Sequence, residues 1–170
     1  MTQPLQPFVE ALGKKIGMSL EVSPDGALFL SLGEQSMLLQ TIDDGKSLLL
    51  YIGIGQPTAF RRGDVFGALL GGNLFLAETR GATLSYDKYR NLVGLNLILP
   101  LERLGADDFT NAVDNMILMA AKWREELARL NKEAEARFNE TQALESVALE
   151  AEGEATPASG EDMSAYMLRV

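Results

Sequence analysis

Apolar side chains recur at helical spacing near the start of the chain. Residues three or four apart share one face of a helix, so these positions form a single stripe: Leu5, Phe8, Val9, Leu12 and Ile16. The sequence predicts a helix that begins near Pro4 or Pro7 and ends before Gly17. Glycine there suits the left-handed residue that commonly follows a helix.

Short apolar segments bounded by turn residues predict five strands. They cover residues 27–32, 36–42, 47–54, 82–86 and 92–99. The loops between the first three strands are short, as is the loop between the last two, and short loops favour antiparallel hairpins. Several strands are apolar on both faces, although an antiparallel sheet usually exposes one face to water. The stripes of the helices can cover one face. The other face is covered either by loops and the middle helix or by a partner.

The middle helix is predicted over residues 65–77, in the stretch "DVFGALLGGNLFLAE". Apolar residues surround its axis, and such a helix must be buried on all sides. In a chain this small we expect a second subunit to cover it. Gly71 and Gly72 would permit close backbone approach there, at a cost of about 1 kcal/mol each in helix propensity. The predicted interface consists of Val65, Phe66, Leu69, Leu70, Gly71, Leu74 and Leu84.

A third, longer helix is predicted over residues 108–138. Its apolar stripe consists of Phe109, Val113, Met116, Ile117, Ala120, Trp123, Leu127, Leu130, Ala134 and Phe138. From Thr141 the pattern decays into an acidic segment rich in Ala, Gly, Ser and Pro, which we expect to be a mobile tail. The predicted organisation is therefore a domain at residues 1–140 and a tail at residues 141–170.

The amino-acid composition limits the kinds of site that the chain can form. The 170 residues include no cysteine and no histidine, so thiolate metal sites are excluded and the commonest general base is absent. A carboxylate-based hydrolase stays open, with Asp43, Asp44 and Asp87 as its only clustered candidates. The formal net charge of −9 would repel nucleic acid. The sequence shows no signal peptide and no apolar run of about 20 residues, so we expect a cytoplasmic protein without membrane insertion.

Three segments together resemble the class I type III secretion chaperones, the Tir chaperone family. They are "SLLLYIGIG", "VFGALLGGNLFLAETRGATLSYDKYRNLVGLNLILPLERL" and "FTNAVDNMILMAAKWREELARL". Their order and spacing carry the resemblance, which spans about residues 5–130. It implies an α+β fold of order α-β-β-β-α-β-β-α, and a homodimer formed through the middle helix and its neighbouring strand. Gly71-Gly72 stands where family members often have alanine before Asn-Leu.

The resemblance also implies a function without catalysis, metal or cofactor. Such a protein binds the N-terminal region of a secreted effector in the bacterial cytoplasm and delivers it to the secretion apparatus, with the secretion ATPase as a further partner. The cargo surface is expected on the less apolar strand face and the first helix: Phe8, Phe29, Leu38, Leu49 and Tyr51. The alternatives are a general protein-binding adaptor on the same fold and the carboxylate hydrolase.

Overall fold

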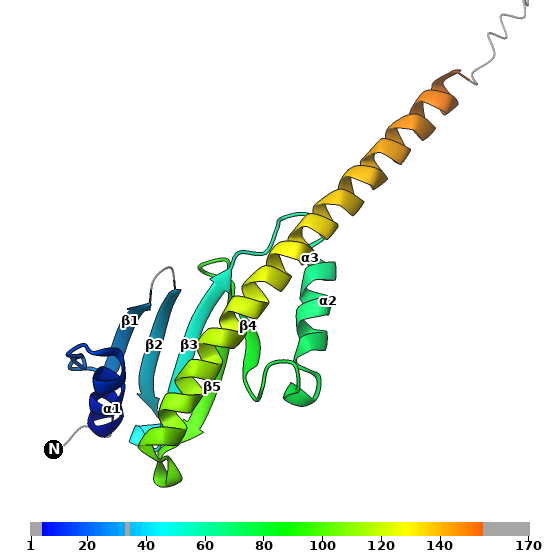
Figure 1. Cartoon of the computed structure of the whole chain (residues 1–170). Helices are drawn as coiled ribbons and strands as arrows, with labels where there is room; N and C mark the ends of the chain where they lie inside the picture. The colour runs from blue at the N-terminus through cyan, green and yellow to red at the C-terminus, as the bar shows by residue number, and fades with distance from the viewer. Residues whose placement is uncertain (1–4, 33–34, 155–170) are drawn as a thin grey trace, which may run out of the picture.

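The computed structural model describes residues 5–32 and 35–154 (Figure 1). Its elements are α1 (Gln6–Ile16), β1 (Ala27–Leu32), β2 (Gln35–Ile42), β3 (Ser47–Gly55), α2 (Arg62–Gly72), β4 (Thr83–Asp87), β5 (Leu92–Pro100) and α3 (Ala106–Glu154), with short 3-10 turns between some of them. This is the α+β order predicted from the sequence, and each strand lies within one residue of its predicted bounds. Gly17 follows α1 in the left-handed conformation, with φ 71°, as expected for a residue that ends a helix.

The five strands form one antiparallel sheet in the order β1-β2-β3-β5-β4. The central strand β3 pairs Leu50 with Leu39 of β2 on one side and with Leu97 of β5 on the other. The ladder between β3 and β5 is irregular between Gly53 and Gly55. Successive side chains point to opposite faces of a sheet, so this register divides the apolar residues into two sets.

One face of the sheet forms the core with the helices. α3 packs along β3 and also contacts α1 and α2 (Figure 1). Leu48, Leu50 and Ile52 are fully buried beneath it, and Phe109 of α3 is as completely buried. Each such side chain contributes about 1.5–3 kcal/mol through the apolar surface it removes from water. The predicted stripe of α3 is this buried face, with Ile117 and Phe138 only partly covered.

The middle helix is shorter than predicted. It ends at Gly72 rather than at residue 77, and Phe75 and Leu76 adopt positive φ angles of 56° and 55°. The Asn73 side chain explains the stop, because it bonds to the edge strand instead of continuing the helix. Its amide donates to the Leu84 carbonyl at 3.1 Å and accepts from the Leu84 N–H at 2.8 Å.

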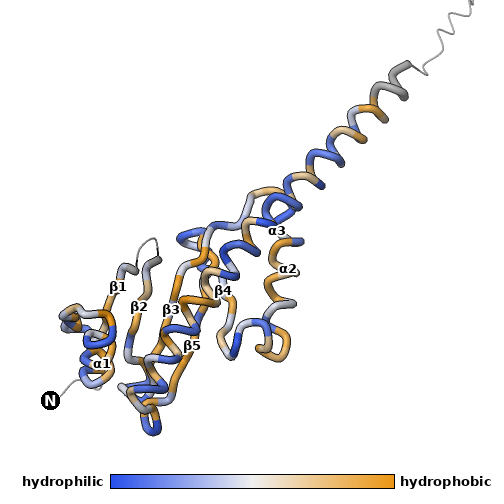
Figure 2. The backbone as a smooth tube through the Cα atoms, in the orientation of Figure 1, coloured by the Kyte–Doolittle hydropathy of each residue, from blue (hydrophilic) through white to orange (hydrophobic). Residues whose placement is uncertain are grey.

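The last helix is longer than predicted, extending to Glu154 instead of ending at residue 138. Residues 139–149 are all exposed, and this part of α3 projects from the body (Figures 1 and 2). Without an apolar stripe the segment gave no amphipathic signal, but it is rich in Ala, Leu and Glu, which favour a helix intrinsically. Residues 141–154 of the predicted tail are thus helical, and the rest of it lies outside the described residues.

Candidate functional site

The second face of the sheet carries an exposed apolar row. Leu38 of β2 pairs with Phe29 of β1 on one side and with Tyr51 of β3 on the other, so the three side chains lie next to one another. Phe29 is 74% exposed, while Leu38 and Tyr51 are half-buried. Leu49 and its partner Ile98, which is 55% exposed, extend this surface toward the other end of the strands. We call these five residues the open face.

The open face contains four of the five residues predicted to contact cargo: Phe29, Leu38, Leu49 and Tyr51. The prediction that Leu49 and Tyr51 point away from the core is confirmed by the alternating burial of β3. Phe8, the fifth residue, lies on the helix side of the sheet. Its ring packs against Phe109 with the ring centroids 5.3 Å apart, so it is separated from the other four.

A groove of about 500 Å³ lies at one end of the open face. Its lining includes Phe29, Leu38 and Tyr51, and also two arginines that sequence reasoning missed, Arg90 and Arg124. No local pattern could have shown that these two arginines meet, because Arg90 is in the turn after β4 and Arg124 is on α3.

Tyr51 forms part of the groove because the neighbouring strand leaves room for its ring. A Cβ atom at Gly94 of β5 would overlap with that ring, so a glycine is required there. Burial raises the pKa of the Tyr51 phenol, the Asp87 carboxylate raises it further, and Arg90 opposes them. The phenol therefore stays protonated at neutral pH and can donate a hydrogen bond.

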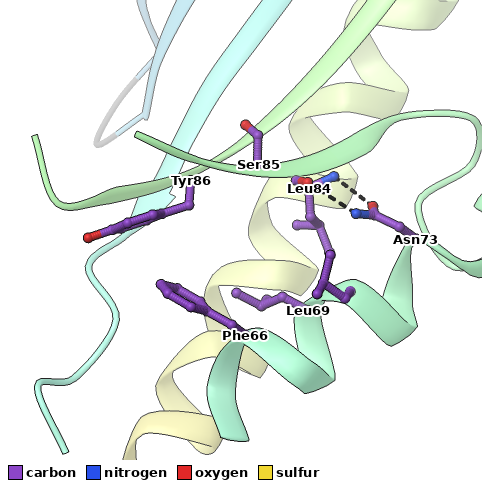
Figure 3. A pocket seen from close by; sticks show the side chains of 7 residues that line it. Phe66, Leu69, Asn73, Leu84, Ser85 and Tyr86 are labelled. Carbon is purple, nitrogen blue, oxygen red and sulfur yellow. Dashed lines mark hydrogen bonds between the residues drawn. The ribbon is translucent and has the colours of Figure 1, made fainter. Parts of the chain in front are cut away.

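A second apolar surface lies between α2 and β4. A pocket of about 260 Å³ lies there, and Figure 3 shows the side chains that line it. It is lined by Phe66, Leu69, Leu70, Asn73, Leu84, Ser85 and Tyr86. The rings of Phe66 and Tyr86 pack at 4.8 Å between centroids, and the double hydrogen bond of Asn73 to Leu84 holds α2 against the strand. Leu74 and Phe75, 64% and 88% exposed, follow the end of α2.

The predicted interface residues divide into three groups. Phe66, Leu69, Leu70 and Leu84 line this pocket, and Leu74 is exposed after it. Val65 is 1% exposed and belongs to the core of its own chain. No other part of the chain lies within 4 Å of a Cβ atom built at Gly71. The close contact occurs at Gly72 instead, where a Cβ atom would overlap with the Trp123 indole.

The carboxylates considered for a hydrolase do not cluster. Asp43 and Asp44 lie in the turn between β2 and β3, whereas Asp87 ends β4. The strand pairing places Asp43 and Asp44 next to the start of β3 and places Asp87 near the end of β3. The nine residues of β3 span about 26–30 Å, too far for carboxylates to share one substrate.

Comparisons with known proteins give a family and a fold. The model of the Tir chaperone protein (CesT) family matches residues 7–124. No curated protein sequence matches the chain. In the part of the chain that the structure describes, no helix is long and apolar enough to cross a membrane.

Three solved structures illustrate the fold similarity. The ExsC–ExsE complex matches at 19% identity with a TM-score of 0.66, over 75% of this chain and 96% of that one. The HopA1–SchA chaperone–effector complex matches at 18% identity and 0.61, over 74% and 98%. The ExoT–SpcS complex from Pseudomonas aeruginosa matches at 16% identity and 0.57, over 72% and 98%.

Proposed function

The chain belongs to the Tir chaperone protein (CesT) family, and we propose that it binds the N-terminal region of a type III secreted effector. It acts in the bacterial cytoplasm, keeps that region non-globular and soluble, and delivers it to the secretion apparatus. The function is binding, without catalysis. The observation that carries the proposal is the open face, an apolar surface on the side of the sheet opposite the helices.

The geometry of the open face suits an extended polypeptide. Phe29, Leu38 and Tyr51 form a row across three strands, and β1 is an edge strand whose backbone groups can pair with an added strand. A segment without its own fold can cover such a surface over a large area at modest affinity per unit area. The similar HopA1–SchA structure is a complex of a chaperone with an effector, which supports the same role here.

The proposal includes a homodimer and a delivery step. The pocket between α2 and β4, with the exposed Leu70, Leu74 and Phe75 beside it, provides an apolar surface for a second copy. Contact with the secretion ATPase is expected from family membership. Neither step needs a nucleotide on this chain, because binding and release of cargo can be equilibrium events.

Replacing Phe29 with serine tests the cargo surface. Phe29 is 74% exposed, so folding should be almost unaffected, whereas cargo affinity should fall by about 1–3 kcal/mol of lost apolar contact. The measurement is co-purification with an effector encoded beside the chaperone gene, together with a thermal melt. The matched control is Leu118→Ser on α3, a 53% exposed residue on the helix side. Equal capture by Phe29→Ser and the control would contradict the proposed surface.

A further inference from the structure

The groove at the end of the open face is lined by two cationic side chains, although the chain as a whole is acidic. The formal net charge is −9, yet the described lining of the groove includes Arg90 and Arg124 and no carboxylate. The rest of the lining is mostly apolar, with Phe29 and Tyr51 as the aromatic residues. Apolar walls with a few placed polar groups are typical of a specific binding site.

The two arginines reach the groove from different elements. Arg124 extends from α3, and one of its N–H groups donates to the Gly53 carbonyl at 3.4 Å. Gly53 lies where the ladder between β3 and β5 becomes irregular. Arg90 extends from the turn after β4 and is 3.4 Å from the Asp87 carboxylate, with its side chain 78% exposed. Both guanidinium groups retain donors for a ligand, since each has five N–H groups.

We propose that this groove selects cargo segments in which an Asp or Glu side chain is flanked by apolar residues. The inference rests on the proposed function and adds a charge preference to it. The apolar residues of the segment would pack on Phe29 and Tyr51, and its carboxylate would accept hydrogen bonds from Arg90 and Arg124. Arginine suits this role because its planar fork matches a carboxylate.

The acidic end of the same chain is too far away to be this ligand. About 30 residues of α3 separate Arg124 from Glu154 and span about 45 Å. The next acidic pair, Glu161 and Asp162, follows about seven residues later and reaches at most about 25 Å even when fully extended. Glu154, Glu161 and Asp162 of the same copy of the chain are therefore not the ligand, and the proposed occupant is another polypeptide.

Peptides that differ at one position test the preference. Fluorescein-labelled 15-residue peptides of alternating leucine and serine would carry Glu, Gln or Lys at the central position, with binding to the full chain followed by fluorescence anisotropy. We expect each arginine to make the Glu peptide bind about two- to fivefold more tightly than the Gln peptide. The Lys peptide should bind most weakly. The preference should shrink as salt is raised.

Arginine variants assign the preference to the groove. A double variant with Arg90→Gln and Arg124→Gln should abolish the preference for the Glu peptide and leave the affinity for the Gln peptide unchanged. The matched control for each single arginine change is Arg103→Gln, which removes one charge beyond β5 at the other end of the strands. If the double variant unfolds in a thermal melt, Arg90→Gln alone must still reduce the preference, because that side chain is mostly exposed.

The outcomes separate this inference from the proposed function. Equal binding of the three peptides, or a Glu preference that survives in the arginine variants, overturns the charge preference while leaving the apolar cargo surface in place. Binding of no peptide, together with no capture of an effector, overturns both. A Glu preference that Arg103→Gln also removes would show a general charge effect, and so would overturn the assignment to the groove.

Discussion

Gly71 and Gly72 are adjacent in α2 but have different surroundings. At Gly72 a Cβ atom would overlap with the Trp123 indole, so the glycine allows α2 to pack closely on α3. At Gly71 no atom of the chain lies within 4 Å of a built Cβ. Both residues lower the helix propensity of α2, but only Gly72 offsets that cost through a contact within its own chain.

Alanine substitution should therefore have opposite effects at the two glycines. Gly72→Ala forces the indole or the helix to move and should lower the free energy of unfolding by about 1–3 kcal/mol. Gly71→Ala should raise it by about 0.5–1 kcal/mol, because alanine favours a helix. Urea denaturation measures both changes, with each variant serving as the control for the other. An equal change in the two variants would show that Trp123 does not restrict α2.

At the scale of elements, α3 combines a packed part with a projecting part. Asn131 holds the loop before α2, accepting from the Thr58 N–H and donating to the Gln56 carbonyl, both at 2.9 Å. Phe138 packs against Phe60 with centroids 4.7 Å apart. Beyond Phe138, residues 139–149 are all exposed, so they add little to the stability of the body.

Truncation should separate these two parts of α3. A chain that ends at Glu140 should melt at nearly the same temperature as the full chain, because residues 141–149 are exposed. A chain that ends at Leu130 is the comparison, and it should melt many degrees lower since it loses Asn131 and Phe138. Circular dichroism against temperature gives both values. A large drop for the chain that ends at Glu140 would mean that residues 141–170 pack on the body.

At the scale of the whole molecule, two of the exposed apolar surfaces of the described residues lie apart from each other. One is the open face, and the other surrounds the pocket between α2 and β4, where Leu70 is 69% and Phe75 88% exposed. The separation allows a protein to bind cargo and a second copy of itself at the same time. A dimer of this kind would present two open faces to one effector segment.

An aspartate at Leu70 tests the proposed homodimer. Because Leu70 is 69% exposed in the single chain, Leu70→Asp should fold normally, whereas a charge buried against a second copy should prevent association. Light scattering at micromolar concentration should give a dimer mass for the native chain and a monomer mass for the variant. Leu118→Asp is the matched control and should remain dimeric. A native chain of monomer mass would contradict the homodimer.

Local patterns in the sequence determined most of the elements. The alternation of residues 47–54 and the stripe from Phe109 to Phe138 depend on neighbours a few positions apart, so the strands, α1 and the buried face of α3 followed directly. The ends of α2 and α3 did not follow. α2 stops where Asn73 bonds to Leu84 on a different element, and α3 continues on helix propensity without an apolar face.

Only the tertiary structure decided which residues meet. Phe8 and Phe29 are both apolar, yet one packs in the core and the other is exposed on the open face, because the helices cover a single side of the sheet. Arg90 and Arg124 share a groove through the packing of α3 across β3. Spacing along the chain reports which face of its own element a residue lies on. Contacts between distant elements depend on how the whole core packs, which no short stretch of sequence specifies.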